Sequence, residues 1–89
     1  MDGLPGGELI DKGLADLARG EETIESLLVS IGGPKLRSLG VEFKSPFEDP
    51  ERRLYTLLGR DHGNKAHGQY NALVRRLVSY ERALSCARS

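Results

Sequence analysis

The chain has 89 residues, of which 38% are hydrophobic and 29% charged, with 13 Lys or Arg balancing 13 Asp or Glu. This length allows one domain with a modest core, and the balanced charge excludes the class of strongly charged disordered chains. The single cysteine excludes an intramolecular disulfide and a zinc knuckle, and it favours a reducing, cytoplasmic location over secretion.

The charges are distributed unevenly along the chain. Residues 1–45 carry a net charge of −3, and residues 46–89 carry +3. We interpret this asymmetry as attraction between the two halves within one fold, with an acidic or polyanionic partner of the C-terminal half as the alternative. No stretch of the sequence is apolar enough to span a membrane, and the first twenty residues lack the features of a signal peptide.

The first twenty residues divide into an arm and an amphipathic helix. Residues 1–6 contain two glycines and a proline, which is typical of a flexible arm, and residues 7–89 are expected to form a single helical domain. The first helix is predicted from Gly7 to Gly20, where Gly13 weakens it by about 1 kcal/mol relative to alanine. Its apolar face carries Leu9, Ile10, Leu14, Leu17 and Ala18. Away from that face lie Asp11, Asp16 and Arg19.

Two further helices are separated by a pair of glycines. The acidic side chains of Glu21 and Glu22 suit the positive end of a helix dipole, so the second helix is predicted to start there. Its apolar positions have helical spacing at Ile24, Leu27, Leu28 and Ile31. Gly32-Gly33 ends this helix, and a short third helix is predicted over residues 34–39.

The middle of the chain is predicted to be a connector followed by a fourth helix. Residues 41–44 alternate like a strand but have no partner strand in the sequence, so we expect an extended connector with its apolar side chains in the core. Asp-Pro-Glu at residues 49–51 predicts a helix start with an acidic N-cap. This helix is expected to end at Gly59, before a polar turn at residues 60–64.

The longest pattern covers about residues 65–88. Apolar side chains recur there at alternating spacings of four and three, at Ala66, Tyr70, Leu73, Leu77, Tyr80, Leu84 and Ala87. This heptad stripe is typical of a helix. The sequence therefore predicts an all-α fold, a small bundle of four to five helices with a long C-terminal helix.

The apolar face of that helix is broader than one neighbouring helix would cover, because Val74 and Val78 lie beside the stripe. A second copy of the chain would cover the remainder. The interface candidates are Tyr70, Leu73, Val74, Leu77, Val78, Tyr80 and Leu84. We therefore expect a small non-catalytic protein that acts through protein–protein interaction, with itself or another protein as partner, as a homodimeric accessory or regulatory subunit.

A helix-turn-helix regulator that binds DNA through residues 21–40 is the alternative. A glycine-containing turn between two short helices is what this motif requires, and Lys35, Arg37 and Ser38 would face the groove. Against it, the preceding helix carries three glutamates that would meet phosphates unfavourably.

An enzymatic alternative rests on the turn after the fourth helix. Arg60, followed by Asp61 and then by His67, resembles the Arg-x4–6-His pattern of HEPN-type helical ribonucleases. The resemblance implies that Arg60 stabilises charge on the scissile phosphate and that His67 acts as acid or base. His62 and His67 lack the helical spacing of a metal pair, so neither a metal nor a cofactor is expected.

Overall fold

The structure is a computed structural model that describes residues 6–43 and 46–88, so the predicted arm lies outside the described residues except for Gly6. It confirms the predicted all-α bundle with a long C-terminal helix. The helices are α1 (Gly7–Ala18), α2 (Ile24–Ile31), α3 (Gly33–Ser38), α4 (Pro50–His62) and α5 (Ala66–Arg88), with a 3-10 turn, η1 (Gly63–Lys65), before α5.

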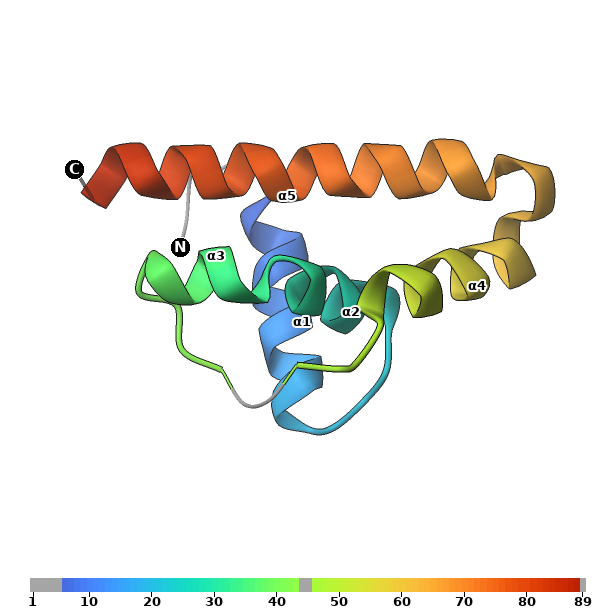
Figure 1. The fold of residues 1–89 in the computed structure, drawn as a ribbon, viewed down its shortest axis with the longest axis horizontal. Helices are drawn as coiled ribbons and strands as arrows, with labels where there is room; N and C mark the ends of the chain where they lie inside the picture. Colours follow the sequence, from blue (N-terminus) through green and yellow to red (C-terminus); the bar gives the residue numbers. More distant parts are fainter. Residues whose placement is uncertain (1–5, 44–45, 89) are drawn as a thin grey trace.

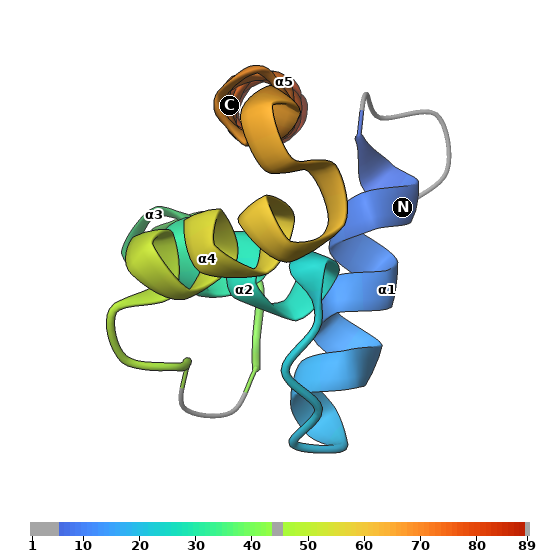
Figure 2. The same ribbon diagram turned by 90° about the vertical axis from the view of Figure 1, so that its right-hand side faces the viewer.

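The helices are arranged around α2 and not around the longest helix. Figure 1 shows α5 as a rod along the longest axis, with α2, α3 and α4 beneath it and α1 crossing behind them. Seen along that rod, α1 stands on one side and the α3–α4 layer on the other (Figure 2). The middle of α2, residues 26–30, is completely buried, because α2 packs against α1, α4 and α5.

The contact between α1 and α2 depends on a glycine. A Cβ atom built on Gly13 would overlap the backbone carbonyl oxygen of Glu25 and would lie 2.5 Å from Cγ2 of Val29. The missing side chain therefore allows the two backbones to approach closely. This packing role was not foreseen from the sequence, where Gly13 counted only as a poor helix former.

A buried carboxylate also joins α1 to the start of α2. Asp16 is 1% exposed, which corrects its predicted place away from the buried face. It accepts hydrogen bonds from Lys12 Nζ at 2.7 Å, from Thr23 Oγ1 at 2.7 Å and from the Arg19 guanidinium. The bond from Lys12, then that from Thr23, holds the pKa of Asp16 below its ordinary value of 3.8, although burial opposes this shift.

The same threonine fixes where α2 begins. Thr23 Oγ1 accepts a hydrogen bond from the Ser26 amide, and Ser26 Oγ accepts one from the Thr23 amide, which together form a capping box. The helix therefore starts at Ile24, and the predicted start at Glu21 and Glu22 is wrong.

The fourth helix differs from the prediction at both ends. Asp49 occupies the N-cap position, as predicted, but it has a left-handed backbone (φ 46°) and its side chain makes no capping hydrogen bond. At the other end, α4 continues through Gly59 to His62, so the predicted end at Gly59 is wrong. Gly63, with φ 55°, makes the actual turn into η1.

A candidate interaction surface along helices α4 and α5

The heptad stripe of α5 faces the interior of the chain itself from Ala66 to Leu84, whereas Ala87 is exposed. Among the predicted interface residues, Leu77, Tyr80 and Leu84 are 3%, 0% and 7% exposed and belong to the hydrophobic core. A partner could reach these side chains only if the fold opened. Leu73 is partly buried against the same core.

The remaining interface candidates form a line at the edge of the core, together with a residue of α4. Tyr55 and Val78 are 44% and 36% exposed, and they are the large hydrophobic side chains that stand out on the described surface. Tyr70 and Val74 are half-buried and lie between them, because positions 70, 74 and 78 are one helical turn apart. The Tyr55 ring packs against the Tyr70 ring with 5.8 Å between centroids. We call these four residues the α4/α5 strip.

Polar and charged side chains border the far end of the strip. Beyond Val78, a hollow of about 460 Å³ separates α3 from the C-terminal part of α5. It is lined by Lys35, Val78, Glu81, Arg82, Ser85 and Cys86. Burial raises the pKa of Glu81 above its ordinary value of 4.5, and the Lys35 charge opposes that shift. An apolar strip with a charged end is the usual composition of a small interaction surface.

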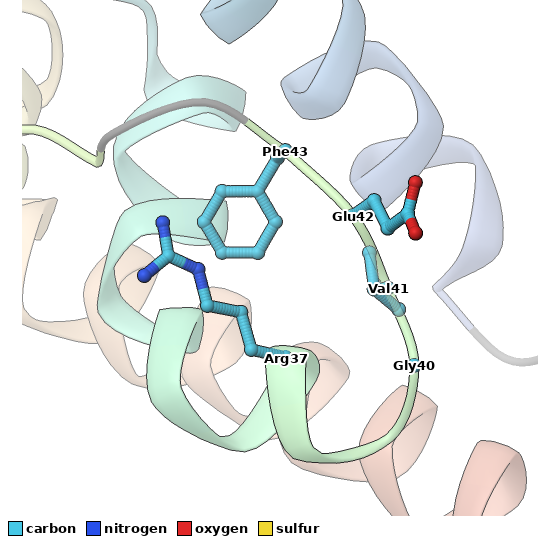
Figure 3. A pocket seen from close by; sticks show the side chains of 5 residues that line it. All are labelled: Arg37, Gly40, Val41, Glu42 and Phe43. Carbon is cyan, nitrogen blue, oxygen red and sulfur yellow. The ribbon is translucent and has the colours of Figure 1, made fainter.

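Two of the three side chains expected to read DNA, those of Arg37 and Ser38, have partners within the fold. The Arg37 guanidinium lies 4.8 Å from the centroid of the Phe43 ring, and Figure 3 shows the two side by side with Glu42 directed away from them. Ser38 Oγ donates a 2.7 Å hydrogen bond to the Lys35 carbonyl. The helix α3 has only six residues and extends from the end of α2 in Figure 1, whereas a recognition helix crosses its partner at a wide angle.

The two residues of the ribonuclease-like pattern lie in different surroundings. His67 is exposed on α5, where its ring is 6.3 Å from that of Tyr55 and its Nε2 lies 3.2 Å from Asn71 Nδ2. Arg60 lies on another side of α4, in a hollow with Arg53 and Glu22. Among the described residues, no hydrogen bond, ion pair or ring contact joins Arg60 to His67, so the two side chains do not form one site.

The charge asymmetry produces little pairing between the two halves of the chain. Across residues 6–43 and 46–88, one ion pair joins the halves, between Arg53 and Glu22 at 2.9 Å. The other ion pairs lie within the acidic half, around Lys12 and Arg19. Among the described residues, direct pairing between the halves is therefore limited to Arg53 and Glu22. The other Arg and Lys side chains of residues 46–87 are exposed to solvent.

Comparison with protein-family models, curated proteins and solved structures gives no match to this chain. Among the described helices, none is long and apolar enough to cross a membrane. The described residues also contain no group of three His, Cys, Asp or Glu side chains placed to hold a metal ion.

Sequence analysis missed Tyr55 as a surface residue. All the interface candidates predicted from the sequence lie on the C-terminal helix, and none lies on the fourth helix. The position of Tyr55, one residue after the buried Leu54, could have indicated its exposure. A large aromatic side chain just beside an apolar helix face lies at the edge of the core.

Proposed function

We propose that this protein is a non-catalytic helical subunit that acts through protein–protein contact, and that it forms a homodimer through the α4/α5 strip. One observation carries the proposal. The large hydrophobic side chains left exposed on the described surface, Tyr55 and Val78, are joined into one line by Tyr70 and Val74. Exposed apolar side chains scattered singly need no explanation, whereas a contiguous line is typical of an interaction site.

A second copy suits this strip because the strip is self-complementary about one point on α5. Two α5 helices that pack antiparallel about position 76 place Val74 of one copy opposite Val78 of the other. The same register places Tyr70 opposite Arg82, a favourable cation–π pair. A twofold axis repeats both contacts, as an isologous interface requires. With 23 residues, α5 is roughly 35 Å long, and α4 adds Tyr55 to the surface that the strip presents.

Replacing Val78 with arginine tests the dimer. Two arginines would face each other's apolar strip near the twofold axis, so we expect the dimer dissociation constant to rise about tenfold or more. Sedimentation equilibrium across a range of protein concentrations measures this change. Ser79→Arg is the matched control, because it adds the same charge one residue away on the exposed outer face of α5 and is expected to leave the dissociation constant unchanged.

Three outcomes would contradict the proposal. The wild-type chain could remain at 9.8 kDa at the highest concentrations. Both variants could dissociate the dimer equally, which would indicate a general charge effect. Val78→Ala, which replaces Val78→Arg if the latter loses helicity by circular dichroism, could leave the dimer as strong as in wild type. Leu77→Glu is unsuitable here, because Leu77 is a core residue and its replacement would unfold the chain.

A further inference from the structure

The outer side of α4 carries a hollow with an unusual concentration of arginine. It is lined by Glu22, Arg52, Arg53, Thr56, Leu57 and Arg60, and its volume is about 150 Å³. Positions 52, 56 and 60 are one helical turn apart, so Arg52, Thr56 and Arg60 form one line along the exposed side of the helix. None of the four residues of the α4/α5 strip lines this hollow, so the two surfaces are distinct.

Three arginines line the hollow, and among the described residues only Arg53 has an ion-pair partner. Arg53 pairs with Glu22 at 2.9 Å, and its guanidinium lies 5.8 Å from the Phe47 ring centroid, so two contacts hold it at the edge of the hollow. Arg52 and Arg60 make no ion pair with any described residue. The charges of the side chains that line the hollow, three arginines and Glu22, therefore sum to about +2. This excess creates a positive potential in the space between the side chains.

We propose that this hollow binds a phosphate group. Guanidinium groups bind phosphate oxygens through paired N–H donors. Arg52 and Arg60, at the two ends of the line, can each bind a different pair of phosphate oxygens. The Thr56 hydroxyl can donate to another oxygen, and Leu57 supplies an apolar side to the hollow. Its volume accommodates one phosphate group but not a whole nucleotide, so the rest of the bearer would remain outside.

The carboxylate of Glu22 lines the same hollow and should weaken the binding of an anion there. Its carboxylate opposes an anion directly and also engages Arg53. Replacement with glutamine removes the repulsion and releases the guanidinium, so Glu22→Gln is expected to bind phosphate about threefold to fivefold more tightly than wild type. A hollow that serves only to hold α4 against the start of α2 would show no such gain.

The test is calorimetric titration of the full chain with inorganic phosphate at constant ionic strength, with chloride as the balancing anion. Arg52→Gln and Arg60→Gln are each expected to weaken binding about threefold to fivefold, and the double variant about tenfold or more. Arg75→Gln is the matched control, because Arg75 is an exposed α5 arginine that also has no ion pair among the described residues.

Further titrations with O-phosphoserine and with a nucleoside monophosphate distinguish a phosphorylated side chain from a nucleotide as the source. Tighter binding of either one identifies the source, and equal binding supports recognition of the phosphate alone. The proposal is overturned if wild type binds phosphate no better than chloride. It is also overturned if Arg75→Gln weakens binding as much as Arg60→Gln, or if Glu22→Gln has no effect.

Discussion

Replacing Gly13 with alanine is expected to destabilise the protein by about 1–3 kcal/mol, although alanine is the better helix former. The added Cβ would overlap the Glu25 carbonyl oxygen, which belongs to the backbone of α2 and cannot rotate away as a side chain can. Either α2 moves as a unit or α1 bends. Both changes disturb the most extensive helix contact in the bundle.

The same substitution at Gly68 provides the control. A Cβ built on Gly68 meets no atom within 4 Å, so Gly68→Ala is expected to stabilise the chain by about 0.5–1 kcal/mol through helix propensity alone. Urea unfolding followed by circular dichroism measures both variants. If Gly13→Ala stabilised the chain as Gly68→Ala does, the close approach of α1 to α2 at Gly13 would be refuted.

Replacing Asp16 with asparagine is expected to lower the melting temperature at pH 7 by on the order of 10 °C. The neutral amide cannot satisfy Lys12 and Arg19 as a carboxylate does, and its NH2 group would face donors at a site that is 1% exposed. Asp11→Asn is the control, since Asp11 is exposed on the same helix and makes no ion pair with a described residue.

The effect of Asp16 should also depend on pH in a defined direction. The pKa of Asp16 is lower in the folded chain than its ordinary value of 3.8, so the ionised carboxylate stabilises the fold above that value. This contribution is lost as the pH falls from 3.8 through the folded pKa. The stability difference between wild type and Asp16→Asn should therefore shrink in that range. A constant difference from pH 7 to pH 2 would show that the carboxylate charge has no part in the effect.

Hydrophobic spacing was sufficient to predict the helical class and most of the buried side chains. The stripe from Ala66 to Leu84 is buried at four positions and partly buried at Tyr70 and Leu73, because the period of a helix places these side chains on one face. Helix ends were harder, because a glycine is both a terminator and a tolerable helix residue. Gly59 lies on an exposed side of α4 and costs the helix only about 1 kcal/mol, so the helix continues past it.

The candidate surface was harder to predict than the core. A broad apolar face indicates only that several neighbours are needed, and those neighbours proved to belong to the same chain. Whether Leu77 or Val78 remains exposed depends on where α4 and α3 pass beneath α5, which sequence spacing does not contain. Asp16 shows the same limit, because its burial becomes favourable only when Lys12, Arg19 and Thr23 converge on it.

The close pairing of α1 and α2 also has a consequence for the order of folding. Only residues 19–23 separate these helices, so closing their loop costs little entropy, whereas α5 must return to α2 across more than thirty residues. We expect the α1–α2 pair to form first, and native-state hydrogen exchange should show its amides to be the slowest to open. Docking of α5 would then be the late event. Because residues 63–65 alone separate α4 from α5, Tyr70 can contact Tyr55 before that step, so the α4/α5 strip would already be present on a partly folded chain.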